Sequence, residues 1–265
     1  MIKIDCKGYA DQILGQVKRQ VSNVVKRKSL MIITAGDDPA SEAYMKGKMN
    51  DCKRCGIVCE QVRVKDQQDL MTKIAIANWT DSVGGIIIQL PLPEGFDEQE
   101  AVNAVQINKD VDGFKKNSPF LPCTPEGIMW ILNHELGGDL SGKTVLLIGK
   151  GKLIGKPLID MLLERGCTLT IAHSKTKNLG DLLWEYHDIV ITGVGKPKLV
   201  DLRCTKAKIV IDAGISRNED GKLCGDCWGF NLDINRDMVV TTVPNGIGLM
   251  TRAMLMKHMG MVNER

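Results

Sequence analysis

The sequence predicts an α/β protein of two domains, and three observations support this. Short apolar runs alternate with segments of helical periodicity, which indicates parallel sheets with crossover helices. The alternation pauses near Pro122 and then starts again. The length of 265 residues suits about two domains at roughly 100–200 residues each. We therefore expect a first domain over residues 1–121 and a second over 122–246, with a last helix over 247–265 that returns to the first domain.

The first domain is expected to begin with a helix over residues 8–28, where apolar residues recur at helical spacing, and a strand over the apolar run 29–35. The next helix is expected to begin at Pro39, with Asp38 as its candidate cap, and to end at Gly56. The remaining predicted elements are a strand at 57–64, a helix at 68–79, a strand at 84–89 and a helix at 97–106.

The second domain centres on a glycine turn, Gly149–Gly155, between an apolar strand at 143–148 and a helix at 153–165. The other predicted elements are helices at 125–136 and 178–186 and strands at 167–172, 188–192 and 208–212. The helical pattern of the last segment, which is expected to return to the first domain, is clearest over 246–259. No internal repeat or long linker interrupts the series.

The composition excludes several classes of protein. Apolar residues make up 43% and charged residues 25%, as in ordinary globular proteins. The net charge of +3 is too small to indicate nucleic-acid or membrane binding, and eleven aromatic residues provide no base-stacking platform. Neither a signal peptide nor an apolar run long enough to cross a bilayer is visible. We therefore expect a cytoplasmic protein that binds neither nucleic acid nor membranes.

Nine cysteines include two Cys-x-x-Cys pairs, Cys52/Cys55 and Cys224/Cys227. Together they have the ligand count of a structural zinc site. However, the pairs lie far apart in the chain, and Cys52 and Cys55 fall within a predicted helix. We expect free thiols, as is usual in a reducing compartment, and no metal.

The glycine turn has the pattern G-x-G-x-x-x-G over Gly149–Gly155, one residue longer than the usual dinucleotide fingerprint. Such a turn can simply allow tight strand-to-helix packing. Two cations beside it, Lys150 and Lys152, favour phosphate binding instead. The sequence therefore predicts a Rossmann-like domain that binds a dinucleotide.

The run His173–Thr176 follows the next predicted strand, where the adenosine ribose of such a cofactor usually lies. An acidic residue there would select NAD through the ribose 2′-hydroxyl. The chain instead has Ser174 and Lys175, which suit a 2′-phosphate. We expect NADP rather than NAD.

Tyr44 and Lys48 lie four residues apart in a predicted helix and therefore share a face. The helix begins beyond the carboxyl end of a strand, where ligands bind in open α/β sheets. A lone lysine is usually a surface charge, but a buried lysine has a lowered pKa and can act as a base. Gln89 closes another buried strand at the same edge, where its amide could orient the amine.

Two alternatives follow from these residues. Asp110 and Asp112 flank a turn, and aspartate is common in turns for local reasons, so either carboxylate could be structural or functional. Tyr-x-x-x-Lys is also the catalytic pair of short-chain dehydrogenases. In that family the glycine turn precedes the pair, whereas here Tyr44 and Lys48 precede the turn at Gly149. This order argues against that family.

In combination, these residues resemble one family, the bifunctional methylenetetrahydrofolate dehydrogenase/methenyltetrahydrofolate cyclohydrolases. The segments that carry the resemblance occur in the family's order and span nearly the whole chain. They are Asp38–Lys48, Gln89–Pro93, Lys109–Phe114, Pro122–Pro125, the turn at Gly149, His173–Thr176, Gly195–Pro197 and Asp212–Ile215.

The resemblance implies an N-terminal folate-binding catalytic domain, a C-terminal Rossmann-like domain and a folate cleft between them. It implies that Lys48 is the catalytic amine, that Tyr44 packs on the folate and that Gln89 tunes the lysine. Asp112 would pair with the amino-pyrimidinone edge of the pterin, a fork of donors that suits a carboxylate. Further residues implied at the folate site are Ile88, Leu90, Pro244 and Gly248. Residues implied at the dinucleotide site are Thr124, Gly149, Lys150, Gly151, His173, Ser174, Lys175, Ile215 and Thr251.

Some positions depart from the family pattern. Lys150-Gly151 stands where the family usually has Arg-Ser, so a hydroxyl is lost and a forked cation becomes a point charge. Near the C-terminus Asn245 and Leu249 replace a glycine and a proline of the family, at the expected junction of nicotinamide and folate. The change at Lys150-Gly151 narrows the expected preference for NADP, and Asn245 and Leu249 could change how the nicotinamide and the folate meet.

We therefore expect an enzyme that oxidises 5,10-methylenetetrahydrofolate with NADP⁺ and hydrolyses the methenyl product to 10-formyltetrahydrofolate. By the same resemblance, a homodimer is expected to form through the cofactor domain. Two alternatives remain: a monofunctional dehydrogenase, and a catalytically impaired folate- or dinucleotide-binding relative. Retention of the four residues Tyr44, Lys48, Gln89 and Asp112 argues against the impaired relative.

Overall fold

The computed structural model describes residues 2–36, 39–229 and 237–264; the predicted cap Asp38 lies outside them. The chain divides into two compact units. The first unit comprises Ala10–Cys123 with Arg252–Arg265, and the second comprises Met1–Tyr9 with Thr124–Thr251.

The first unit contains a three-stranded parallel sheet of order β3-β2-β4. Its strands are β2 (Ser29–Ala35), β3 (Cys59–Val64) and β4 (Val83–Ile88). Every residue of β4 is buried, and β2 pairs with both neighbours. Parallel strands covered on both faces have such continuous apolar sequences. The carboxyl ends of β2 and β4 therefore lie next to each other, at the edge from which Gln89 follows.

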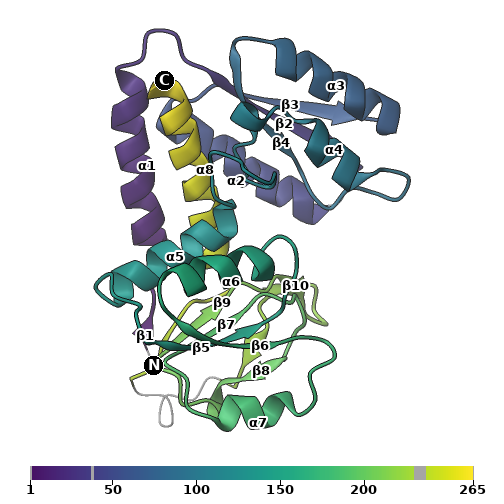
Figure 1. The fold of residues 1–265 in the computed structure, drawn as a ribbon. Helices are drawn as coiled ribbons and strands as arrows, with labels where there is room; N and C mark the ends of the chain where they lie inside the picture. Colours follow the sequence, from purple (N-terminus) through teal and green to yellow (C-terminus); the bar gives the residue numbers. More distant parts are fainter. Residues whose placement is uncertain (1, 37–38, 230–236, 265) are drawn as a thin grey trace. The chain divides into compact units, whose positions relative to one another are not determined.

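Helices surround this sheet (Figure 1). They are α1 (Cys6–Ser22), α2 (Pro39–Cys55), α3 (Gln67–Trp79), α4 (Glu98–Ala104) and the C-terminal α8 (Ile247–Glu264), with a short 3-10 helix η1 (Ile107–Lys109). The predicted helix over residues 8–28 ends earlier, at Ser22. The amides of Asn23 and Val24 bond only three residues back, which is how helices often terminate.

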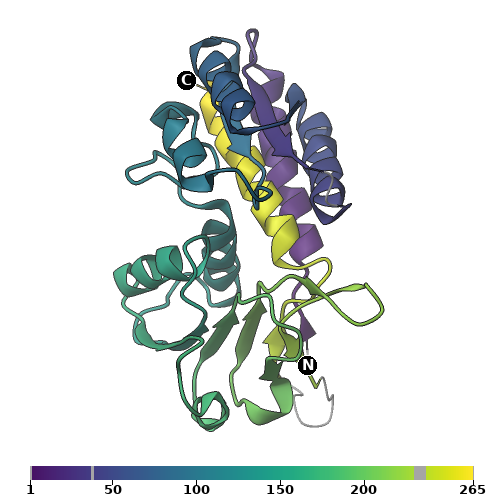
Figure 2. The same ribbon diagram turned by 90° about the vertical axis from the view of Figure 1, so that its right-hand side faces the viewer.

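The C-terminal part of α8 packs within the first unit, alongside α1 (Figure 2). A Cβ atom on Gly260 would lie 3.3 Å from a methyl group of Val17. The Asn263 side chain accepts a 2.7 Å hydrogen bond from the Lys28 backbone amide. A segment far removed in sequence thus completes the core of this unit.

The second unit contains a six-stranded sheet of order β1-β13-β9-β7-β5-β6, with every pair parallel. Its strands are β1 (Ile2–Lys3), β5 (Thr144–Ile148), β6 (Thr168–Ala172), β7 (Ile189–Thr192), β9 (Ile209–Asp212) and β13 (Val239–Val240). The chain passes from β5 to β6 on one side and then to β7 on the other. Ligands bind at the carboxyl ends of strands beside such a switch.

The other elements in the described residues of the second unit are helices and short strands. They are α5 (Cys123–Glu135), α6 (Gly155–Glu164), α7 (Leu179–Trp184), β8 (Val200–Asp201), η2 (Leu202–Cys204), β10 (Ser216–Arg217), β11 (Leu223–Cys224) and β12 (Cys227–Trp228). Among the described residues, no helix is both long and apolar enough to cross a membrane.

The N-terminal residues depart from the expected domain boundary. A first domain over residues 1–121 would include β1, but β1 pairs in parallel with β13 and so belongs to the sheet of the second unit. A two-residue strand has no periodicity from which this partner could be predicted. The unit expected to begin at residue 122 therefore also contains the start of the chain.

Candidate active site

Lys48, Tyr44 and Gln89 lie together in the first unit. Lys48 is 5% exposed, and its Nζ donates a 3.0 Å hydrogen bond to Gln89 Oε1. The same Nζ lies 5.2 Å from the centre of the Tyr44 ring, within the range of a cation–π contact. Helix α2 brings Tyr44 and Lys48 onto one face because they are four residues apart. The amine is thus buried and held by two neighbours.

Gln89 is itself oriented by the end of β4. Its backbone amide donates to the Ile33 carbonyl at 2.9 Å, and its side-chain Nε2 donates to the Leu90 carbonyl at 2.9 Å. With Nε2 committed to Leu90, the carbonyl oxygen of the amide faces Lys48. The amide therefore presents an acceptor to the amine in a defined direction. Ile88 and Leu90, the predicted folate-lining residues, flank this amide.

In the segment Lys109–Asp112, the first two charged residues are structural. Lys109 Nζ donates to three carbonyls at the end of α3, those of Ala77, Asn78 and Thr80, at 2.8–2.9 Å. The Asp110 carboxylate accepts from the amides of Phe114 and Lys115 at 3.3 and 2.9 Å. Both charges are used to hold the loop.

Asp112 is the other carboxylate of this loop, and its environment differs from that of Asp110. Burial raises the pKa of Asp112, while Lys48 nearby lowers it and Asp110 raises it further. The amides of Phe114 and Lys115 bond to the Asp110 carboxylate, so the loop does not need the Asp112 carboxylate to close. Of the two aspartates left open by the sequence, Asp112 is therefore the one placed beside the amine and suited to ligand binding.

In the second unit, the glycine turn has the close approaches that its sequence predicts. Gly149 has φ +107°, a conformation that favours glycine. A Cβ atom on Gly155 would lie 2.3 Å from the Gly149 carbonyl oxygen, so only glycine fits where α6 begins. Helix α6 has no side-chain cap; the Lys156 amide closes the turn by donating to the Gly151 carbonyl at 3.0 Å. Lys150 and Gly151 are exposed on this turn.

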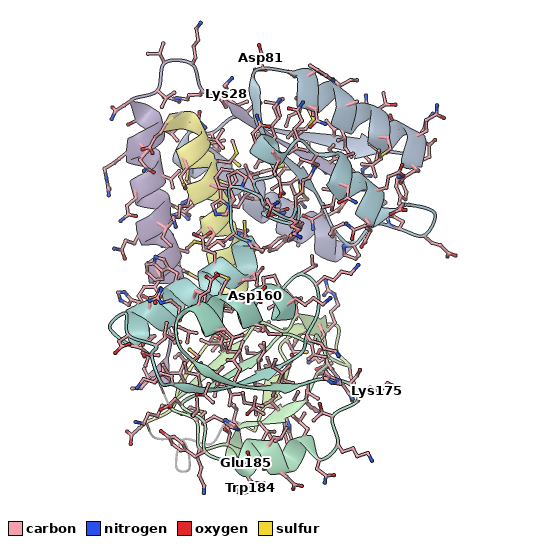
Figure 3. All side chains as sticks on the ribbon, in the orientation of Figure 1. Lys28, Asp81, Asp160, Lys175, Trp184 and Glu185 are labelled. Atoms are coloured by element: carbon pink, nitrogen blue, oxygen red, sulfur yellow. The ribbon has the colours of Figure 1, made fainter. Side chains whose placement is uncertain are left out.

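The loop after β6 lies next to the glycine turn. The amide of Gly149 donates to the Ala172 carbonyl at 2.8 Å, which brings His173 beside the start of the turn. The loop is held by bonds from the His173 amide to Thr176 Oγ1 and from the Lys175 amide to His173 Nδ1, at 2.9 and 3.2 Å. Ser174 and Lys175 remain exposed, with Lys175 at the surface beyond β6 (Figure 3).

A buried aspartate that the sequence analysis missed shapes the neighbouring loop after β7. Asp226 is fully buried. Its carboxylate accepts from Thr192 Oγ1 at 2.6 Å, from the Val194 amide at 2.8 Å and from the Lys196 amide at 2.7 Å. It therefore holds the Gly195–Pro197 segment at the carboxyl end of the sheet. No local pattern in the sequence indicates this role, because the partners of Asp226 lie about thirty residues earlier in the chain.

The predicted residues near the C-terminus also belong to the second unit. Thr124 and Thr251, expected at the cofactor, hydrogen-bond to each other at 3.0 Å, and Thr251 Oγ1 donates to the Ile247 carbonyl. Pro244 and Gly248, expected at the folate, lie in this unit, whereas Ile88, Leu90 and Asp112 lie in the first. Ile215 follows β9 and is 56% exposed.

The substitution at Asn245 has a physical explanation. Asn245 has φ +72°, a left-handed conformation that asparagine tolerates better than most residues. A Cβ on the next residue, Gly246, would lie 2.1 Å from the Thr242 carbonyl oxygen. The turn can therefore accept Asn245 in place of glycine but requires glycine at 246.

All nine cysteines are free. Cys52 and Cys55 are buried on α2, and Cys224 and Cys227 lie on β11 and β12 of the second unit. In the described part of the chain, no three His, Cys, Asp or Glu side chains are grouped so that they could hold a metal ion.

Together, the folds and sites define a two-domain α/β protein: one domain carries a buried lysine-centred site, and the other a dinucleotide-type glycine turn. Comparison with known families is consistent with both parts. Residues 4–112 match the model of the tetrahydrofolate dehydrogenase/cyclohydrolase catalytic domain, and residues 122–265 match its NAD(P)-binding domain. The chain belongs to the tetrahydrofolate dehydrogenase/cyclohydrolase family, which confirms the predicted family and fold class.

Individual relatives agree along the whole chain. The bifunctional protein FolD of Agathobacter rectalis is 37% identical over 271 residues, covering 96% of each chain. Among solved structures, the bifunctional FolD methylenetetrahydrofolate dehydrogenase/cyclohydrolase of Campylobacter jejuni is 33% identical with a TM-score of 0.90, covering 100% of this chain and 99% of that one. The Trypanosoma brucei enzyme, solved with NADP cofactor and inhibitor, is 27% identical with a TM-score of 0.90, covering 100% and 97%.

Proposed function

We propose that this protein is a bifunctional enzyme of one-carbon metabolism. It oxidises 5,10-methylenetetrahydrofolate to the 5,10-methenyl compound with NADP⁺, and hydrolyses that cation to 10-formyltetrahydrofolate. The observation that carries the proposal is the buried Lys48 amine, held by Gln89 and placed beside Tyr44. Membership of the dehydrogenase/cyclohydrolase family supports both activities.

Hydrolysis is the step that needs acid–base help. Water adds to the methenyl carbon and loses one proton, which gives a neutral hydroxy adduct. The bond from that carbon to N5 then breaks as the hydroxyl loses its proton to form the formyl carbonyl and N5 takes up a proton, so one proton is released overall. Lys48 Nζ is the group suited to move these protons, because the amine is buried and Gln89 fixes its direction. Tyr44 provides an aromatic face beside the amine, against which a flat pterin can pack. Asp112 offers its carboxylate to the paired N–H donors of the pterin.

Oxidation depends on holding two ligands in the right orientation. The residues of the second unit fit a dinucleotide: the glycine turn lets its pyrophosphate approach the backbone closely, and Ser174 and Lys175 suit a 2′-phosphate. When bound, NADP⁺ supplies the acceptor for a hydride from the methylene carbon. The chain itself needs no base for this step, because the adjacent nitrogen of the substrate stabilises the cation that remains.

A monofunctional dehydrogenase and a catalytically impaired binding protein are the alternatives. Two assays distinguish these alternatives from the bifunctional enzyme. The first measures formation of methenyltetrahydrofolate with NADP⁺, and the second measures whether added methenyltetrahydrofolate disappears faster than by spontaneous hydrolysis. The bifunctional enzyme gives both signals. Oxidation alone would indicate the monofunctional dehydrogenase, and neither signal would indicate a binding protein.

We expect NADP⁺ to be preferred over NAD⁺, by a smaller margin than an Arg-Ser turn would give. Lys150, Lys175 and Ser174 are the exposed partners for a 2′-phosphate, and each charge-assisted contact contributes about 1.5–3 kcal/mol. Initial rates with methylenetetrahydrofolate and each cofactor measure the preference as kcat/KM. Lys175→Met should reduce it, while Lys177→Met, an exposed lysine two residues further on, is the matched control. Equal use of both cofactors by the parent would contradict the prediction.

We expect a homodimer formed through the second unit. Family analogy motivates this, and β6 is an edge strand of the described sheet with Ile171 38% exposed; such edges are available for pairing or for cover by another chain. Light scattering at micromolar concentration should give twice the mass of one chain. A mass of 29.2 kDa, that of a single chain, would contradict it.

We also propose that the protein is located in the cytoplasm. Nine free cysteines, five of them buried, suit a compartment that keeps thiols reduced. Fractionation of the source cells, followed by detection of the protein in the cytoplasmic fraction, tests this.

A further inference from the structure

The two peptide groups that flank Asp112 are both held by side chains or amides from elsewhere in the first unit. The carbonyl oxygen of Val111, which belongs to the peptide before Asp112, lies 2.8 Å from His258 Nδ1. The same oxygen accepts a hydrogen bond from Cys123 Sγ at 3.5 Å. The carbonyl of Asp112 itself accepts from the Cys123 amide at 3.3 Å. The backbone direction at Asp112 is therefore set from both sides.

His258 contributes the shorter of the two contacts to the Val111 carbonyl. It lies on α8 and is 2% exposed, and its ring stacks on Phe120 with centres 4.7 Å apart and an angle of 29°. A carbonyl can only accept, so Nδ1 carries the proton in this contact. The stacking fixes the plane of the ring and thereby the direction of that N–H.

Cys123 is a second residue that links His258 to the Val111–Asp112 segment. It is 2% exposed, its Sγ lies 3.6 Å from His258 Nδ1, and it is near enough to the Asp112 carboxylate to lower the pKa of that group. The imidazole, the thiol and the carboxylate thus lie together around the Val111–Asp112 peptide. Lys48 lies close enough to influence the same carboxylate.

We propose that His258 is a positioning residue for folate recognition, acting through the Val111 carbonyl to aim the Asp112 carboxylate. This rests on the proposed function, in which Asp112 binds the pterin. A carboxylate that accepts two parallel N–H bonds must match the direction of both donors, and rotation of the preceding peptide would misalign it. His258 does not contact the substrate; it holds the residue that does.

Charge gives an independent signature. The groups that act on Asp112 are Lys48 from α2, His258 from α8, Cys123 from α5 and Asp110 from its own loop. Lys48, His258 and Cys123 lower the pKa of Asp112, whereas burial and Asp110 raise it. Removal of the imidazole therefore raises the pKa further. The loss of folate affinity on acidification should begin at a higher pH in the variant than in the parent.

The test compares His258→Phe, which keeps the aromatic stack but loses the donor, with His258→Asn, whose amide can donate in place of Nδ1. In the Phe variant the KM for methylenetetrahydrofolate should rise about tenfold, in line with loss of one buried hydrogen bond. The kcat and the KM for NADP⁺ should change little, and Asn should restore the parent KM. His187→Phe is the matched control, because that histidine is buried in the second unit and its Nε2 lies 3.0 Å from the Leu182 carbonyl.

An active parent whose KM for folate is unchanged by His258→Phe would overturn this inference alone, as would an Asn variant as impaired as the Phe variant. A parent without either activity would overturn the proposed function and this inference together. If His258→Phe does not fold, an NMR measurement on the parent protein tests the proposal instead. The NMR signal of the His258 Nδ1 proton should shift when tetrahydrofolate is added, while the ring signals of His187 stay unchanged. No shift at His258 would overturn the proposal.

Discussion

Replacement of Lys48 with methionine is expected to slow the hydrolysis of methenyltetrahydrofolate by roughly 10²–10⁴-fold, the usual worth of general acid–base assistance. Methionine keeps most of the apolar stem but removes the amine that donates to Gln89. Folding should be little affected, because methionine fills a similar space at this buried position. The measurement is the rate at which the methenyl absorbance decays, corrected for spontaneous hydrolysis.

Oxidation of methylenetetrahydrofolate should fall much less in the same variant, because hydride transfer depends on the placement of two ligands. Lys46→Met is the matched control: Lys46 lies on the same helix but is exposed, so both activities should stay near those of the parent. Gln89→Leu should impair hydrolysis in the same direction, through loss of the acceptor that orients the amine. A folded, folate-binding Lys48→Met variant that hydrolyses at the parent rate would rule out Lys48 as the catalytic base.

Asp112→Asn is expected to weaken folate binding by about 1.5–3 kcal/mol, the typical cost of losing a charge-assisted hydrogen bond. This corresponds to roughly 10- to 150-fold in affinity, since about 1.4 kcal/mol is tenfold. The Kd for tetrahydrofolate and the Kd for NADP⁺ should both be measured by calorimetry. Cofactor affinity is the internal control and should stay near the parent value, because Asp112 lies in the first unit and the glycine turn in the second. Equal losses for both ligands, or none for folate, would show that Asp112 only supports its loop.

The pH dependence of folate binding provides a second test of Asp112. Binding requires the ionised carboxylate, and burial raises the pKa of that carboxyl above its ordinary value. The ionised form is therefore lost at a higher pH than for an exposed aspartate, and affinity should fall as the pH is lowered through the raised pKa. Asp112→Asn should be weak throughout and lack this transition. A parent whose affinity changes only in the ordinary carboxyl range would contradict the assignment.

Much of the architecture could be predicted because it depends on local patterns. Apolar runs and helical spacing predicted the strand at Ser29–Ala35 to the residue and most other elements within a few positions. The four-residue spacing of Tyr44 and Lys48 predicted their common face, since helix geometry alone determines it. Gln89 was predicted beside them because parallel strands end at one edge of a sheet.

Other features depend on contacts between distant residues and only the tertiary structure decided them. Asp110 and Asp112 look alike in sequence, and their roles separate only because the Phe114 and Lys115 amides bond to Asp110. β1 could not be assigned to the second unit from two residues without its partner β13.

His258 and Asp226 illustrate the same limit. His258 occupies an ordinary position in a helical pattern. Its role depends on its contact with the Val111 carbonyl, 147 residues away along the chain. Asp226 holds amides of a loop some thirty residues earlier, at Val194 and Lys196. Periodicity reports which residues are buried but not which partner a buried polar group finds. That partner is determined by how the chain packs, because a polar group is stable in the interior only where a complementary group meets it.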